Sequence, residues 1–118
     1  NLQKNIFYSF MKHCDFMIGN SSSGIWEGPS FNCAYINVGE RQSGRKKGNN
    51  VLSVSGYKQS DIHRAINSAT SKKFKERIVK SENPYGDGEA TKKIITRLKT
   101  VDLDLALRKK IFGDISFQ

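Results

Sequence analysis

A short apolar run, a small-residue turn and a second apolar run follow one another between residues 15 and 45, and this pattern most constrains the fold. The first run covers residues 16–19, and Gly-Asn-Ser-Ser-Ser-Gly follows at 19–24. The second run covers residues 34–38. Neither run alternates apolar with polar residues, which is typical of parallel strands covered on both faces. The pattern predicts strand, turn, helix and strand, with a short or bent helix over residues 24–31.

The remaining patterns extend this unit into an α/β domain. Apolar residues at helical spacing predict helices over 2–13 and 62–69, the second one starting at Ser60 or Asp61. A short strand is predicted over 51–54. The first helix has no strand before it, so it resembles the end of a βα unit that began earlier. We therefore expect the later part of a Rossmann-like parallel-sheet domain.

Basic and amphipathic helices are predicted after the sheet. A basic helix is expected over 72–80, so the sheet and its crossover helices occupy about residues 2–80. Late helices are expected over about residues 87–112, after a turn in which Asp87 is placed to cap the first of them. Two stripes of apolar residues mark the late helices: Ala90, Ile94, Ile95 and Leu98, then Leu103, Leu107 and Ile111.

The composition favours a basic cytoplasmic protein with anionic partners. The net charge is +9, and 36% of the residues are hydrophobic. No apolar run approaches the roughly 20 residues that span a bilayer, so no membrane partner is expected. Cys14 and Cys33 do not form a metal-binding motif, and we expect free thiols in a reducing compartment.

The serine turn is the candidate binding site, because a helix start offers unpaired N–H groups to an anion such as phosphate. The site residues we single out are Ser21, Ser22, Ser23, Gly24, Glu27 and Arg41. Glu27 lies one helical turn after Ser23, where a carboxylate could accept both hydroxyls of a ribose. Favourable placement near the helix dipole explains Glu27 equally well, so both interpretations remain open. Arg41 follows the second strand, at the edge where α/β sheets usually hold their ligands.

Three motifs in this order resemble the C-terminal part of UDP-N-acetylglucosamine 2-epimerases, particularly the hydrolysing branch that feeds sialic and legionaminic acid synthesis. The motifs are Ile-Gly-Asn-Ser-Ser-Ser-Gly with Glu27 and Pro29, Arg-Gln-Ser-Gly-Arg at 41–45, and Asn-Pro-Tyr-Gly-Asp-Gly at 83–88. The resemblance implies one half of a glycosyltransferase-B type fold, with the N-terminal domain absent. It also implies a nucleotide-sugar partner. The family often forms homo-oligomers, but the sequence shows no interface, so the oligomeric state stays open.

The resemblance implies roles for the site residues as well. Ser21, Ser22, Ser23 and Gly24 would hold the diphosphate, Glu27 the ribose hydroxyls, and Arg41 the nucleotide end of the site. The implied reaction eliminates a nucleoside diphosphate and then adds water with inversion at C2, giving an N-acetylmannosamine-type sugar. It needs neither NAD nor an essential metal. Donors near the departing diphosphate would lower the barrier electrostatically.

The length of the chain sets it apart from this family, whose members are several times longer. The groups that would move protons lie in regions outside these 118 residues, so no catalytic residue is assigned and the piece alone should be inactive. Two alternatives remain: the donor-binding half of a glycosyltransferase of the same fold, and a basic nucleic-acid-binding module using 45–47 and 72–80. The absence of aromatics interleaved with those basic residues counts against nucleic acid. The choice between uridine and guanosine, and the sugar substituent at C4, stay open.

Overall fold

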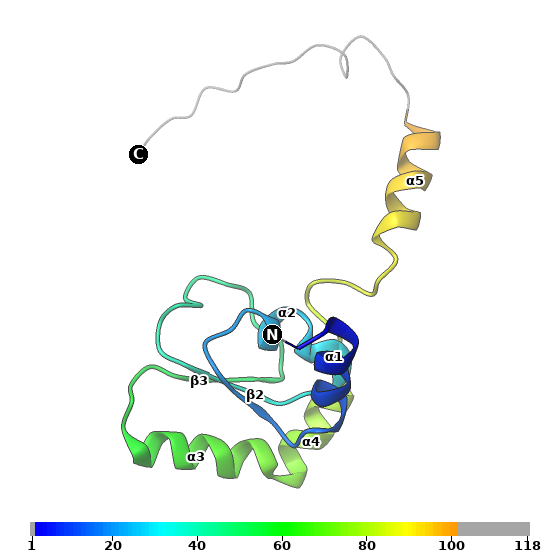
Figure 1. Ribbon diagram of the computed structural model, residues 1–118. Helices are drawn as coiled ribbons and strands as arrows, with labels where there is room; N and C mark the ends of the chain where they lie inside the picture. Colours follow the sequence, from blue (N-terminus) through cyan, green and yellow to red (C-terminus); the bar gives the residue numbers. More distant parts are fainter. Residues whose placement is uncertain (1, 102–118) are drawn as a thin grey trace, which may run out of the picture. The chain divides into compact units, whose positions relative to one another are not determined.

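A three-stranded parallel sheet forms the centre of the chain in the computed structural model, which describes residues 2–101 (Figure 1). The strands β1 (Met17–Gly19), β2 (Tyr35–Val38) and β3 (Val51–Val54) lie in the order β1-β2-β3. Ile18 pairs with Ile36, which pairs with Leu52. The parallel α/β sheet predicted from the two apolar runs is confirmed.

Helices cover both faces of this sheet. Helices α3 (Gln59–Thr70) and α4 (Lys72–Val79) pack on one face, and α3 runs along the strands in Figure 1. Side chains of β2 point alternately to opposite faces, as the strand geometry requires. The apolar core between the sheet and these two helices contains Ala34, Ile36, Val54, Ala65, Ala69, Phe74 and Ile78.

Three short elements precede and follow β1. They are α1 (Lys4–His13), α2 (Ser23–Trp26) and the 3-10 helix η1 (Gly28–Phe31). The single helix predicted over 24–31 is therefore two short pieces that meet at Glu27. Pro29 lies in the first turn of η1, where its missing N–H leaves no gap in the hydrogen bonding, whereas inside one continuous helix it would remove a bond.

The start of α3 is shifted from the prediction, whereas α4 begins at Lys72 as predicted. α3 begins at Gln59 with Lys58 as its N-cap, so neither Ser60 nor Asp61 starts it; Asp61 lies in the first turn and pairs with Arg64. Lys58 has an extended backbone, so the loop ends there and the helix begins one residue before Ser60. At α4 the cap is a side chain, since the Ser71 hydroxyl accepts a hydrogen bond from the Phe74 N–H at 3.3 Å.

A second unit begins at Gly88, and its described part contains α5 (Ala90–Thr100). Glu89 is the N-cap of α5, so Asp87 does not cap it as expected. The stripe predicted to be buried is exposed: Ile94 is 58%, Ile95 47% and Leu98 70% accessible. Periodicity predicts an apolar face but not what covers it. The stripe at 103–111 lies outside the described residues.

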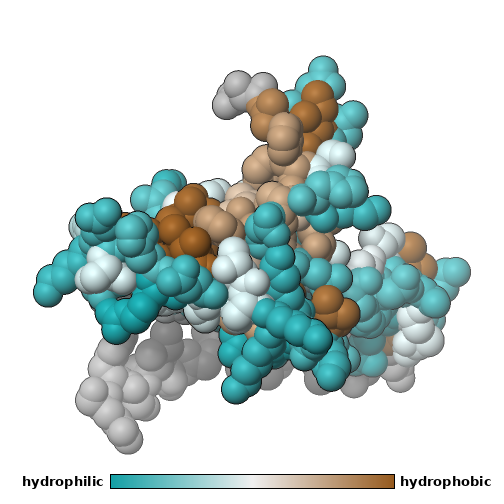
Figure 2. All heavy atoms as spheres, turned by 90° about the horizontal axis from the view of Figure 1, so that it is seen from below, coloured by the Kyte–Doolittle hydropathy of each residue, from teal (hydrophilic) through white to brown (hydrophobic). Residues whose placement is uncertain are grey.

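On the face shown in Figure 2, hydrophilic side chains predominate around smaller hydrophobic areas. No helix within residues 2–101 is both long enough and apolar enough to cross a bilayer.

Candidate functional site

The serine turn follows β1 directly and is open to solvent. Ser21 is exposed, while Ser22 and Ser23 are half-buried. The expected capping is made by one serine only: the Ser21 hydroxyl accepts a hydrogen bond from the Ser23 N–H at 3.3 Å. Ser22 is the N-cap of α2 but makes no side-chain cap bond, since its backbone is already helical. The turn therefore keeps a serine hydroxyl that is not used in capping.

Gly24 brings α2 against the sheet. It is buried, and a Cβ atom added there would lie 2.3 Å from the ring of Tyr35 on β2. Such a distance leaves room for no side chain. The glycine in the Ser-Ser-Ser-Gly turn is thus required by packing, besides any role it has toward a ligand.

The ring of Tyr35 lies against Gly24 of the serine turn. Burial raises the pKa of the Tyr35 hydroxyl, and the nearby Ser21 backbone and the positive charge of Arg41 partly oppose that rise. The hydroxyl is buried and has no hydrogen-bond partner among residues 2–101.

The loop after β2 is fixed to the serine turn by Gln42. Its side chain is only 3% exposed, and its Nε2 donates a hydrogen bond to the Asn20 carbonyl at 2.7 Å. Arg41, next to it, is exposed. Both segments leave the carboxyl ends of adjacent parallel strands, so they meet at one edge of the sheet, as expected. The sequence showed Gln42 within a motif but indicated no role for it.

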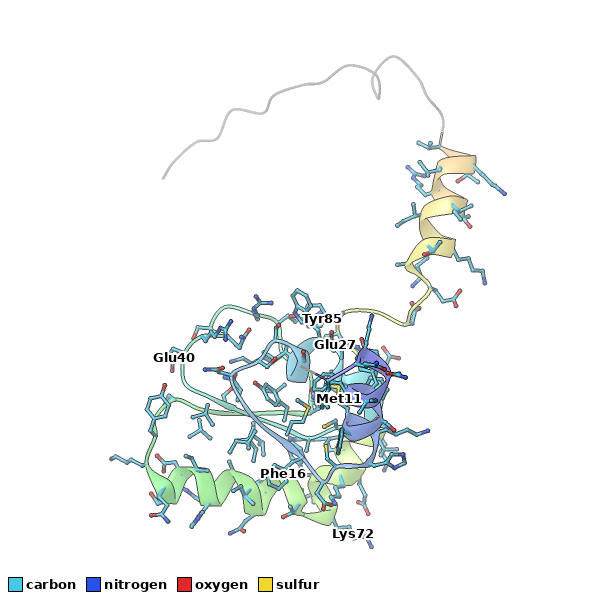
Figure 3. All side chains as sticks on the ribbon, in the orientation of Figure 1. Met11, Phe16, Glu27, Glu40, Lys72 and Tyr85 are labelled. Carbon is cyan, nitrogen blue, oxygen red and sulfur yellow. The ribbon has the colours of Figure 1, made fainter. Side chains whose placement is uncertain are left out.

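Glu27 lies where α2 ends and η1 begins (Figure 3). The residue is half-buried, and its Oε2 atom is buried without a hydrogen-bond partner in the described part of the chain. A carboxylate oxygen in such a position is an acceptor that a ligand hydroxyl can satisfy. Glu27 is both the C-cap of α2, where the helix dipole disfavours an anion, and the N-cap of η1, where it favours one, so the dipole does not distinguish the two interpretations of this residue.

Sequence reasoning missed the part played by the Asn-Pro-Tyr-Gly turn. It reaches the same region: Tyr85 lies near Glu27 in Figure 3, and its ring centroid is 5.9 Å from that of Trp26. The guanidinium of Arg45 lies 5.0 Å from the Trp26 ring centre. Trp26 is 47% exposed, and its indole ring has Tyr85 and Arg45 as neighbours. The motif itself was the signal, but it was interpreted only as a turn.

The two cysteines are free, as expected, and lie together beside this region. Their sulfur atoms are 3.6 Å apart, with Cys33 buried and Cys14 partly exposed at the end of α1. Burial first, and then the neighbouring Cys14 sulfur, raise the pKa of the Cys33 thiol to about 12.

Alkylation is therefore expected to distinguish the two thiols. Iodoacetamide at pH 8 should label Cys14 well before Cys33, because only the thiolate reacts and that of Cys33 is strongly disfavoured. Peptide mass spectrometry over a time course measures this order, and addition of urea should make the two rates similar. Equal rates in the folded protein would contradict the burial of Cys33.

No group of three or more His, Cys, Asp or Glu side chains within residues 2–101 is arranged to hold a metal ion. The polar groups that do converge are hydroxyls, a carboxylate, an amide and guanidinium groups. This set suits an anionic ligand with hydroxyls of its own, rather than a metal.

The fold and this convergence define a class: an α/β domain with a parallel sheet and polar loops gathered at the carboxyl edge of its strands. Comparison with known proteins then gives the family. Residues 1–99 match the family model described as UDP-N-acetylglucosamine 2-epimerase. The chain belongs to the UDP-N-acetylglucosamine 2-epimerase family, as the resemblance of its motifs predicted.

Several curated relatives are similar over most of this chain. It is 42% identical over 110 residues to the GDP/UDP-N,N'-diacetylbacillosamine 2-epimerase (hydrolyzing) of Campylobacter jejuni, which covers 92% of the chain. It is 34% identical over 111 residues to the UDP-N,N'-diacetylbacillosamine 2-epimerase (hydrolyzing) of Legionella pneumophila, covering 93%. It is 39% identical over 85 residues to the polysialic acid biosynthesis protein P7 of Escherichia coli, covering 72%.

The chain spans only part of these relatives. It covers 28% of the length of the Campylobacter and Legionella proteins, and 22% of the Escherichia protein. It therefore corresponds to about a quarter of a family member.

Proposed function

We propose that this chain is the nucleotide-diphosphate-binding part of a hydrolysing sugar-nucleotide 2-epimerase, within one half of a glycosyltransferase-B type fold. The intact protein, by which we mean the polypeptide at the full length of its relatives, would convert a UDP-N-acetylglucosamine-type substrate to an N-acetylmannosamine-type sugar and nucleoside diphosphate. The Campylobacter and Legionella relatives are named as hydrolysing 2-epimerases, which supports an epimerase over a glycosyltransferase.

The observation that carries the proposal is the meeting of the serine turn and the arginine loop at one sheet edge, through the bond from Gln42 to Asn20. In the proposal, the hydroxyls of Ser21, Ser22 and Ser23 and the backbone at Gly24 receive the diphosphate. Arg41 contributes positive charge beside it. With α2 only four residues long, a helix dipole contributes little, and individual donors provide the binding.

The chemistry required of these residues is electrostatic. Elimination breaks the C1–O bond and removes the proton on C2, and negative charge then collects on the departing diphosphate. Donors already aimed at that group stabilise the transition state without having to reorganise. Water then adds to the resulting 2-acetamidoglucal. The groups that remove and return protons lie outside this chain in the proposal.

Glu27 gives the direct test. In the intact protein, Glu27→Ala should weaken UDP binding at least tenfold, about 1.4 kcal/mol, because two hydrogen bonds from ribose hydroxyls to a carboxylate are lost. Titration calorimetry with UDP and with GDP measures the affinity and also identifies the preferred base.

The matched control is Glu76→Ala on α4, a largely exposed carboxylate on the other face of the sheet. It removes the same charge and should leave UDP affinity unchanged. Unchanged affinity in Glu27→Ala, or an equal loss in both variants, would contradict the assignment of the ribose to Glu27.

A further inference from the structure

The Asn-Pro-Tyr-Gly turn makes more contacts with the candidate site than a connecting turn requires. Asn83 Nδ2 donates hydrogen bonds to the Trp26 carbonyl at 3.0 Å and to the Ser30 hydroxyl at 2.8 Å. These two residues lie on either side of Glu27, one in α2 and one in η1. Asn83 thus bridges the two pieces across Glu27, in addition to the backbone bonds that Glu27 makes with Ser23 and Ser30.

Tyr85 makes the corresponding contact with the loop after β2. Its hydroxyl donates a hydrogen bond to the Lys46 carbonyl at 2.7 Å, 39 positions away in sequence. Its ring packs on Trp26, and Arg45 lies over the same indole. Gln42 already ties the start of this loop to Asn20, so Tyr85 provides the second anchor of the segment that carries Arg41.

Asn83 also holds Tyr85 in place. The Oδ1 atom of Asn83 accepts a hydrogen bond from the Tyr85 N–H at 2.9 Å, so the two side chains form one unit. Tyr85 is 46% exposed and Asn83 half-buried, and neither belongs to the apolar core. Their bonds go to backbone or hydroxyl groups of the two segments that carry candidate site residues. This placement favours a role in arranging the site over a role in stabilising the core.

We propose that Asn83 and Tyr85 form a clasp of positioning residues, with Asn83 setting Glu27 toward the ribose and Tyr85 setting the Arg41 loop toward the diphosphate. The inference deepens the proposed function and depends on it. It assigns separate parts of the nucleotide to the two clasp residues. A purely structural role would not separate them.

The test of Tyr85 compares UDP with uridine in the intact protein, each competing against labelled UDP. Tyr85→Phe keeps the ring on Trp26 and removes only the bond to the Lys46 carbonyl. It should lower the affinity for UDP about five- to tenfold. This is the effect of losing one hydrogen bond whose carbonyl partner can bond to water instead. Uridine has no phosphate and should bind as to wild type. Tyr57→Phe, at a side chain that is 78% exposed, is the matched control and should change neither affinity.

Asn83→Ala tests the other half of the clasp. It should lower the affinities for UDP and for uridine by the same factor. It should also reduce the ratio of the affinities for UDP and 2′-deoxy-UDP, because Glu27 is no longer held toward the ribose. Asn83→Asp keeps the acceptor for Tyr85 but loses the donor, and should behave in the same way. Thermal midpoints of both variants are measured without nucleotide. A loss of affinity without a lowered midpoint does not come from unfolding.

The possible outcomes separate the clasp from the proposed function. If wild type does not bind UDP, or Glu27→Ala binds it normally, the proposed function fails and the clasp fails with it. If wild type binds UDP and Glu27→Ala weakens it, the proposed function stands. In that case the clasp would be overturned if Tyr85→Phe lost affinity for UDP and uridine equally, or lost affinity for neither.

Discussion

Asn50→Asp is expected to destabilise the sheet domain by about 4 kcal/mol, because it places an unpaired charge in the interior. The Asn50 side chain is 0% exposed. Its Nδ2 donates two hydrogen bonds of 3.0 Å, one to the Gly24 carbonyl and one to the Cys33 carbonyl. A carboxylate has no proton to donate and would face two carbonyl oxygens.

Urea denaturation of the intact protein measures this effect. Asn49→Asp is the matched control, since it makes the same chemical change at the exposed neighbouring position and should shift the free energy of unfolding by less than about 0.5 kcal/mol. Asn50→Ala should fall between the two, because it leaves the carbonyls unpaired without adding charge. A loss in Asn50→Asp no larger than in Asn49→Asp would show that this amide does not hold α2 to the sheet.

Gly24→Ala is expected to destabilise the protein by about 3 kcal/mol through overpacking. The added Cβ would lie 2.3 Å from Cγ and Cδ2 of Tyr35, at the base of a ring that belongs to the central strand. A ring base cannot swing aside as the end of a flexible side chain can, so either α2 or β2 must move.

The control for Gly24→Ala is Gly56→Ala, where an added Cβ meets nothing within 4 Å. That change should be close to neutral. Combining Gly24→Ala with Tyr35→Val frees the space, and the double variant should be more stable than the sum of the two single effects predicts. Simple additivity would mean that the ring and the glycine do not limit each other. The same free energies of unfolding test whether the contact between Gly24 and Tyr35 holds the serine turn against the sheet.

Much of the fold was predictable from local patterns. The apolar runs indicated parallel strands covered on both faces. β1 and β2 are found there and pair in parallel, and β2 is buried, but Ile18 on the edge strand β1 is 48% exposed, so the expected burial of the first strand is wrong. Pro29 indicated a short or bent helix, and the structure divides the segment at Glu27. The strand positions and the divided helix were predictable because apolar runs and proline geometry act over a few neighbouring residues. The motifs likewise identified the family, since they retain their order and spacing along the chain.

The helix boundaries were less predictable. Asp87, Ser60 and Asp61 are all good capping residues, yet α5 and α3 begin elsewhere. Capping preference is worth about 1 kcal/mol, which backbone geometry in the folded chain easily outweighs. The apolar stripe of α5 shows a related limit, since its pattern is real but its side chains Ile94, Ile95 and Leu98 are exposed.

By itself, the sequence determined the parallel sheet, the open serine turn and the family to which the chain belongs. Only the tertiary structure decided which amide groups hold the site together: Gln42 on Asn20, Asn50 on Gly24 and Cys33, and Asn83 on Trp26. The physical reason is that each of these side chains binds a backbone carbonyl. Every residue carries such a carbonyl, so no residue type marks the partner, and only the folded backbone brings the right one within reach.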